Sequence, residues 1–319
     1  MQLDDVRQTF ESLIAEVEKV IVGQAELVEA ALLALFCEGS VLVEGAPGLG
    51  KTLLANTLAR VTSCEFQRVQ FTPDLMPSDL TGHSIFDMRE SALRFQPGPV
   101  FTNLLLADEV NRSPPKTQSA LLEAMQERQV TIDGKTHRLP DPFLVIATQN
   151  PIEHEGTYPL PEAQIDRFLF KILVGYPSAE EETEILARLV SGRDPRHLET
   201  YELEPIVGPA DLVAIREAVR SVVIEPSILS YITAIVRATR EDEAVEFGAS
   251  PRGSAGIVIA ARTLAACRGR DFVVPDDVKE IAPLVLRHRL ILHPEAEIEG
   301  IDADAAIARI LDAVPAPNE

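Results

Sequence analysis

The pattern of apolar and polar positions changes character part-way along the chain. At the N-terminus, Asp4 to Val20 carries apolar residues at helical spacing, which predicts an amphipathic helix. Ile21 to Gln24 interrupts that pattern, and Ala25 to Phe36 predicts a second, strongly apolar helix. The apolar stripe of the first helix consists of Val6, Phe10, Leu13, Ile14 and Val17.

Short apolar runs up to residue 176 predict a set of buried strands. Asn103 to Asp108 has the continuous hydrophobic character that is typical of a central strand in a parallel sheet. The predicted strands are Ser40–Glu44, Phe66–Phe71, Asn103–Asp108, Phe143–Thr148 and Phe168–Val174. Helices are predicted at Thr52–Val61, Pro114–Arg128 and Pro161–Ile165. This part of the chain therefore predicts an α/β domain with a central parallel sheet.

Two further segments predict hairpins inserted into that domain. Thr72 to Gly98 is punctuated by Pro and Gly and contains two alternating pieces, which indicates a short helix interrupted by a hairpin. Gln129 to Leu139 alternates on either side of Asp133-Gly134, a strong signal for a two-residue hairpin turn. Both segments are expected to be additions to the core rather than linkers.

After Tyr176-Pro177 the strand signals nearly stop. Acidic residues cluster in the first turns of several predicted helices, as the helix dipole favours. The predicted helices are Ser178–Val190, Pro209–Arg220, Pro226–Arg240, Arg252–Arg268, Pro275–Arg289 and Asp302–Leu311. The chain of 319 residues is long enough for two domains, and the change predicts an α/β domain over 1–176 and a helical domain over 177–319.

The candidate chemistry centres on Gly45 to Thr52, which reads GAPGLGKT and fits the phosphate-binding loop pattern at every fixed position. It lies between a predicted strand and a predicted helix, so phosphates would sit at a helix N-terminus. The Lys51 ammonium would reach the β- and γ-phosphates, and the Thr52 hydroxyl is suited to ligate Mg²⁺. The loop residues expected to surround the nucleotide are Ala46, Pro47, Gly48, Leu49, Gly50, Lys51 and Thr52.

Asp108-Glu109, at the end of the most apolar strand, supplies the second half of a predicted ATP site. Asp108 would hold Mg²⁺, with a water between them, and Glu109 would orient and polarise the attacking water. Thr52 and Asp108 are thus the predicted Mg²⁺ residues, and ATP and Mg²⁺ the predicted cofactors.

Composition argues against a nucleic-acid-binding protein, a Cys/His metal site and a membrane-spanning protein. The net charge of −21 argues against a protein that grips nucleic acid through a basic face. Three scattered cysteines and six histidines show no metal-ligand spacing. The longest apolar run, Ala30 to Cys37, falls far short of the roughly 20 residues that cross a bilayer. With no apolar signal core near the N-terminus, we expect a cytoplasmic protein that does not insert into membranes.

Taken in order, the motifs resemble those of the MoxR family of AAA+ ATPases. The matching stretches are GAPGLGKT, FTPDLMPSD, ADEVNRSPPKTQSALLEAMQE, ATQNP, LPEAQIDRF and GASPRG, and they lie within residues 20 to 262. The resemblance implies an AAA+ P-loop NTPase core with a central parallel sheet, hairpin insertions and a C-terminal all-α lid domain.

The resemblance also implies roles for single residues. Asn150 resembles the sensor that contacts the γ-phosphate or the attacking water. Arg167 resembles the arginine finger supplied to a neighbouring subunit, with Arg112 as the competing candidate. Arg252 resembles the lid arginine that senses the γ-phosphate, although a cation at a helix start opposes the dipole. Val22, Gly23 and Gln24 lie where the family contacts adenine.

The implied function is Mg²⁺-dependent ATP hydrolysis coupled to chaperone-like remodelling or maturation of a protein client, such as metal insertion or complex assembly. Family members form rings, so a homo-hexamer is expected, often with a von Willebrand factor A domain partner. A metal chelatase motor subunit remains an alternative, and a nucleic-acid motor a weaker one. Intact Glu109 and Asn150 argue against a scaffold that binds nucleotide without hydrolysing it. The sequence does not identify the client.

Overall fold

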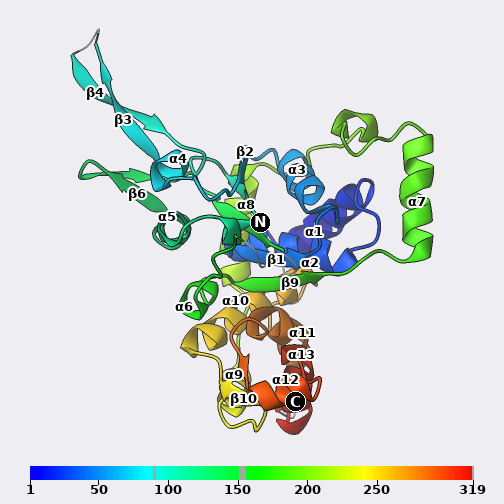
Figure 1. The fold of residues 1–319 in the computed structure, drawn as a ribbon. Helices are drawn as coiled ribbons and strands as arrows, with labels where there is room; N and C mark the ends of the chain where they lie inside the picture. The colour runs from blue at the N-terminus through cyan, green and yellow to red at the C-terminus, as the bar shows by residue number, and fades with distance from the viewer. Residues whose placement is uncertain (89–90, 151–155, 318–319) are drawn as a thin grey trace.

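The computed structural model describes residues 1–88, 91–150 and 156–317 (Figure 1). Its centre is a five-stranded sheet in the order β2-β5-β8-β1-β9, in which all neighbours are parallel. The strands are β1 (Val41–Gly45), β2 (Phe66–Gln70), β5 (Leu104–Asp108), β8 (Leu144–Gln149) and β9 (Phe170–Val174). The predicted parallel sheet is therefore confirmed.

Both faces of the sheet are covered, which explains why its central strands are apolar throughout. Side chains alternate between the faces, so Val41 and Val43 join one core and Leu42 joins the other. Helices α1 (Leu3–Glu18), α2 (Ala25–Cys37) and α3 (Lys51–Val61) contribute to the first core. Helix α5 (Pro115–Glu127) contributes to the second. A 3-10 turn, η1 (Val110–Arg112), links β5 to α5, and the short α6 (Glu162–Ile165) precedes β9.

The longer predicted insertion is the short helix α4 (Pro77–Thr81) followed by a hairpin of β3 (Gly82–Asp87) and β4 (Ala92–Pro97). It projects far from the sheet (Figure 1). Gly82 has φ +88°, and a Cβ there would lie 2.2 Å from the carbonyl oxygen of Gln96, so only glycine fits the base of the hairpin. Near the tip, Phe86, Met88 and Leu93 expose most of their surface.

The shorter hairpin joins β6 (Gln129–Ile132) to β7 (Lys135–Arg138) directly after α5. Its turn residues Asp133 and Gly134 have φ of 50° and 75°, the conformation that the Asp-Gly pair predicted. In Figure 1 it extends from the same side of the molecule as the β3–β4 hairpin. Both predicted hairpins are confirmed.

The C-terminal part is helical. Its helices are α7 (Ala179–Val190), η2 (Leu198–Tyr201), α8 (Pro209–Arg220), α9 (Pro226–Ala238), α10 (Pro251–Cys267), α11 (Pro275–Leu286), α12 (Pro294–Ile298) and α13 (Ala303–Ala313). A small antiparallel pair, β10 (Val245–Phe247) with β11 (Ile291–Leu292), corrects the expectation of helices alone. Strands of two and three residues are too short to give a recognisable alternation.

The two parts share one core, because buried residues of α8 and α10 pack with those of α1 and α2. Helix α7 differs, since none of its residues is buried and Figure 1 shows it set apart from the other C-terminal helices. The domain boundary at residues 176 and 177 stays a prediction. Among the described residues, no helix is both long and apolar enough to cross a membrane.

Candidate functional site

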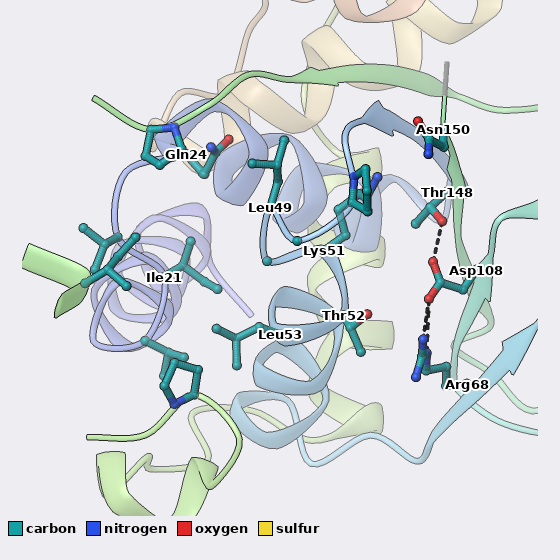
Figure 2. Close-up of a pocket in the computed structure, with 18 of the residues that line it drawn as sticks. Ile21, Gln24, Leu49, Lys51, Thr52, Leu53, Arg68, Asp108, Thr148 and Asn150 are labelled. Carbon is teal, nitrogen blue, oxygen red and sulfur yellow. Dashed lines mark hydrogen bonds and ion pairs between the residues drawn. The ribbon is translucent and has the colours of Figure 1, made fainter. Parts of the chain in front are cut away.

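A cavity of about 520 Å³ opens beside the carboxyl ends of the parallel strands, where ligands bind in open α/β sheets (Figure 2). The predicted loop lines one wall of it through residues 47 to 52. The opposite wall carries Asp108, Glu109 and Asn150 from the ends of β5 and β8. The topology thus brings these separately predicted motifs into one cavity.

The phosphate-binding loop has the backbone that its glycines predict. Gly48 and Gly50 have φ of 85° and 78°, and a Cβ at either position would meet no atom within 4 Å among the described residues. Conformation, not crowding, therefore requires glycine there, and the space beside the loop remains open for phosphate. Lys51 begins α3, and its ammonium donates to the carbonyl oxygen of Gly45 at 2.6 Å. Burial lowers the pKa of Lys51, although nearby carboxylates, first Asp108, oppose that shift.

Asp108 accepts hydrogen bonds on both carboxylate oxygens. The Thr148 hydroxyl donates to Oδ1 at 2.6 Å, and the Arg68 guanidinium donates to Oδ2 through Nη2 at 2.7 Å and Nε at 3.2 Å (Figure 2). The Thr148 hydroxyl also accepts the backbone N–H of Glu109 at 2.9 Å. Thr148 on β8 therefore holds the Asp108 carboxylate at the end of β5 and the backbone of Glu109, the next residue.

Glu109 has a left-handed backbone with φ 56°, which turns its side chain out of the strand direction. Its Oε2 accepts a hydrogen bond from the Gln70 amide at 2.8 Å and forms an ion pair with Nη1 of Arg112 at 2.9 Å. The carboxylate that would orient water is thus held by two protein groups. It must release at least one of them before it can accept from water through that oxygen.

The far end of the cavity is more apolar. Its lining there includes Val20, Ile21 and Val22, together with Ile185 of α7 and Tyr201. Gln24 has φ 61°, and its side-chain amide donates to the carbonyl oxygen of Gly175 at 3.0 Å. An apolar recess at the end of a phosphate cradle is suited to a purine base. Two predicted contacts, Gly23 and Ala46, do not line the cavity, although their neighbours do.

Comparison with known proteins identifies the family. The model of the ATPase family associated with various cellular activities (AAA) matches residues 40–170, and that of the AAA lid domain matches residues 237–310. Chaperone MoxR1 of Mycobacterium tuberculosis is 50% identical over 97% of this chain and 83% of its own length. Protein MoxR of Methylorubrum extorquens is 33% identical over 99% of this chain and 97% of its own. The chain belongs to the MoxR family of AAA+ ATPases.

The same fold is present in a crystal structure of a protein from Cytophaga hutchinsonii that is assigned as an ATPase. The two sequences are 44% identical, and the two structures superpose with a TM-score of 0.91. The alignment covers 99% of this chain and 97% of the other. The MoxR resemblance, the AAA+ core with a helical lid, and the assignment as an ATP hydrolase are therefore confirmed.

Two of the arginines that the MoxR resemblance singled out, Arg167 and Arg252, lie elsewhere, whereas Arg112 pairs with Glu109. Arg167 and Arg252 line a second cavity of about 220 Å³, together with Asp166 and Arg289, and neither lines the phosphate cavity. Asp166 organises this surface, because Arg289 donates to its Oδ1 at 2.8 Å and Arg252 pairs with its Oδ2 at 3.6 Å. The fold does not bring these arginines to the phosphates of their own chain.

The residues present fit a Mg²⁺–nucleotide complex. The Thr52 hydroxyl and the Asp108 carboxylate both line the cavity, supplying the hard oxygen ligands that Mg²⁺ prefers. The glycine loop leaves the adjoining space free of side chains, as phosphate binding through backbone N–H groups requires.

The sequence interpretation missed Arg68, Gln70 and Thr148, which contact the acidic pair. A signal was available in the alternation of FQRVQF, which places Arg68 and Gln70 on the same face of β2. The contact with Asp108 depends on β2 lying beside β5, and that neighbour relation is not written in the local pattern.

Proposed function

We propose that this MoxR-family protein is a Mg²⁺-dependent ATPase that couples hydrolysis to the remodelling or maturation of a protein client. The observation that carries the proposal is that Lys51, Thr52, Asp108 and Glu109 line one cavity beside strands that continue into the projecting hairpins. Strand β2 continues through α4 to the longer hairpin, and β5 continues through η1 and α5 to the shorter one. Movement at the carboxyl ends of β2 and β5 can thus reach the two hairpins through α4 and α5, respectively.

In the proposed mechanism, the loop N–H groups and the Lys51 ammonium hold the β- and γ-phosphates. Thr52 and Asp108 would hold Mg²⁺, which neutralises the charge that develops on the phosphates during transfer. Glu109 orients and polarises the attacking water after its carboxylate has broken its hydrogen bond with Gln70 or its ion pair with Arg112. Asn150, at the end of β8, positions the γ-phosphate or the same water.

Completion of the site requires a second subunit. Because Arg167 and Arg252 lie away from their own phosphate cavity, we assign them to the γ-phosphate of a neighbouring subunit. A contact of this kind is heterologous, and heterologous contacts close into rings when the rotation allows. A hexamer is the proposed ring size, as the family resemblance implies.

The two hairpins are the proposed client-contacting parts. The exposed side chains of Phe86, Met88 and Leu93 give the longer hairpin an apolar tip, the type of surface that binds other proteins. A von Willebrand factor A domain partner, the client class and a cytoplasmic location stay predictions from the sequence. A chelatase motor remains the alternative, and a nucleic-acid motor is disfavoured by the net charge of −21.

The nucleotide site is tested by separating binding from hydrolysis. Lys51→Ala should abolish nucleotide binding, whereas Glu109→Gln should keep binding and lose turnover, because only the water-orienting carboxylate changes. Binding is measured by calorimetry and turnover by phosphate release. Glu123→Gln, an exposed change on α5, is the control and should resemble the wild type. Hydrolysis by Glu109→Gln at the wild-type rate would refute the assignment.

A further inference from the structure

Arg289 holds the segment of chain that carries Arg167. It follows the last turn of α11, and its side chain is only 4% exposed. Its guanidinium makes five hydrogen bonds, and four of the acceptor oxygens belong to residues 166–169. The acceptors are Asp166 Oδ1 at 2.8 Å, the carbonyl oxygens of Asp166 at 3.0 Å, Phe168 at 2.7 Å and Leu169 at 3.2 Å, and the carbonyl oxygen of Val285. Arg167 therefore lies inside a segment that one buried side chain holds.

The five bonds use every donor that the Arg289 side chain has. A guanidinium carries five N–H groups in a rigid planar fork. In Arg289 the Nε donates once, and Nη1 and Nη2 each donate twice. A lysine has three donors on a flexible stem and cannot reproduce this set. The shape of the Arg289 side chain, and not only its charge, therefore specifies the position of residues 166–169.

The peptide group that leads into Arg167 is held at both edges. Its carbonyl oxygen, from Asp166, accepts from Arg289. Its N–H, from Arg167, donates to the carbonyl oxygen of Gln164 at 3.2 Å. Arg289 also holds the carbonyl oxygen of Phe168, on the other side of Arg167. Arg167 itself is exposed, so its side chain extends from a fixed stretch of backbone.

Asp166 also connects this segment to Arg252, but less firmly. Arg252 pairs with Asp166 Oδ2 at 3.6 Å and its side chain is 48% exposed, whereas Arg289 meets Oδ1 at 2.8 Å. An exposed ion pair of this length contributes little to stability. The hold of Arg289 therefore acts mainly on the backbone beside Arg167.

A fixed starting point matters for an arginine finger. Such a group stabilises charge that develops only in the transition state, so it must already be in place when the reaction occurs. A misplacement of about 1 Å can cost about 10²-fold in rate. Backbone that holds Arg167 in one position therefore contributes directly to the rate that this arginine can support.

We propose that Arg289 is a positioning residue that sets the place from which Arg167 reaches the γ-phosphate of the neighbouring subunit. The inference rests on the proposed role of Arg167. Arg289 lies within the part of the chain that matches the AAA lid domain, residues 237–310. The lid of each subunit therefore aligns the finger that completes the site of the next subunit.

The first test replaces Arg289 with lysine, which keeps the charge and removes the fork. Arg289→Lys should bind ATP normally in calorimetry, because the phosphate-binding loop is untouched. Its kcat should fall by up to about 10²-fold, the cost of displacing the finger by about 1 Å. The control Arg287→Lys makes the same change at a similarly buried arginine, which donates to the carbonyl oxygen of Lys171 and should leave kcat nearly unchanged.

The second test locates the defect in the neighbouring site. Arg289→Lys subunits are mixed with Glu109→Gln subunits, and phosphate release is measured in rings shown to contain both. Some interfaces then pair an intact Glu109 with a finger that Arg289 still aligns, so activity should partly return. A substitution that merely damaged its own nucleotide site would show no recovery, because every intact Glu109 would lie in a damaged subunit.

A double variant tests whether the effect runs through Arg167. Adding Arg289→Lys to Arg167→Ala should change turnover much less than Arg289→Lys does alone, since the group that it positions is already gone. Fully additive losses would overturn the inference, as would wild-type kcat in Arg289→Lys or no recovery in mixed rings. Should Arg289→Lys fail to fold in a thermal melt, Asp166→Asn weakens the same ion pair with a smaller change, and the mixing experiment then decides.

Failure of the inference can be told from failure of the proposed function. Wild-type turnover in Arg167→Ala would remove the finger itself and overturn the proposed role of Arg167. A large loss in Arg167→Ala, together with normal turnover in Arg289→Lys, would leave that role intact and overturn only the positioning by Arg289.

Discussion

The phenyl ring of Phe95, on β4, stacks on the imidazole of His137, on β7, with centroids 4.0 Å apart and planes 24° apart. Phe95 also contacts the ring of Phe101 edge-on at 5.4 Å, just before β5 begins. The two hairpins are inserted at different points of the chain, yet they touch through this pair. A displacement of either hairpin therefore acts on the other through the contact between Phe95 and His137.

The stack should be measurable as a coupling in stability. Phe95→Ala, His137→Ala and the double variant should show an interaction free energy of about 1 kcal/mol in urea unfolding, the usual range for aromatic pairs. Phe86→Ala combined with His137→Ala is the control, since Phe86 is exposed on the other strand of the hairpin, and its effects should add. Additive effects for Phe95 and His137 would mean that the hairpins are independent.

Arg167→Ala should bind ATP nearly normally, because Lys51, Thr52 and Asp108 are untouched, yet lose about 10³-fold in turnover. Mixed with Glu109→Gln subunits, it should recover part of the activity, since some interfaces then pair an intact Glu109 with an intact Arg167. Phosphate release from mixed rings measures this.

Arg252→Ala should behave in the same way, because Arg252 lies with Arg167 around the second cavity. Recovery seen with Arg112→Ala and not with Arg167→Ala would transfer the finger to Arg112. No recovery for any of the three arginines, in rings shown to contain both variants, would contradict a site shared between subunits.

Asp277 is fully buried near the start of α11 and should be among the most sensitive positions in the helical part. It pairs with Arg268 and Arg270 and accepts the backbone N–H of Val274 at 3.0 Å. Asp277→Ala leaves two arginines without their shared carboxylate, and we expect a loss of about 3 kcal/mol in unfolding free energy. Asp276→Ala, its exposed neighbour, should cost less than about 0.5 kcal/mol. Similar losses for both would contradict this explanation.

His288 should make stability depend on pH. Its Nε2 donates to the carbonyl oxygen of Phe168 at 3.0 Å, and its Nδ1 has no hydrogen-bond partner among the described residues. Burial, with Arg289, Lys171 and Arg287 nearby, lowers the pKa of His288 well below its usual value. The imidazole therefore binds a proton near pH 6.5 in the unfolded chain but stays neutral in the folded chain. The free energy of unfolding consequently falls as the pH drops below about 6.5.

The measurement is urea unfolding at pH 7, 6 and 5. His288→Gln keeps a donor and cannot titrate, so it should lose less stability toward pH 5, by up to about 1.4 kcal/mol per pH unit. His83→Gln, an exposed change, should follow the wild-type profile. Identical pH profiles for the wild type and His288→Gln would refute the role of this ring.

The sequence predicted most of the fold because its signals are local. The apolar run before Asp108 and the Asp133-Gly134 turn each specify their structure within a few residues. The glycine loop likewise specifies its own conformation, since the positive φ of Gly48 and Gly50 depends on those single residues. This made the phosphate site predictable from the sequence. Local patterns therefore sufficed for the sheet, the hairpins and the loop.

What the sequence did not predict depends on neighbours in space. The contact of Arg68 with Asp108 requires β2 to pair with β5, a relation between residues far apart in the chain. The separation of Arg252 from its own phosphate cavity depends on how α10 packs, which no motif encodes. The strands β10 and β11 form because their segments meet, not because either alternates.

Gly82 pairs with Pro97 at the base of the β3–β4 hairpin, so the chain leaves the body and returns to it at one point. The tip of the hairpin, beyond the contacts that Phe95 makes with His137 and Phe101, can be lengthened, shortened or replaced without changing the distances between the strands that carry Arg68 and Asp108. The tip of the hairpin can therefore vary independently of the sheet that carries the nucleotide site. Under the proposed function, a change at the tip of this hairpin would alter the client that it contacts and leave the nucleotide site unchanged.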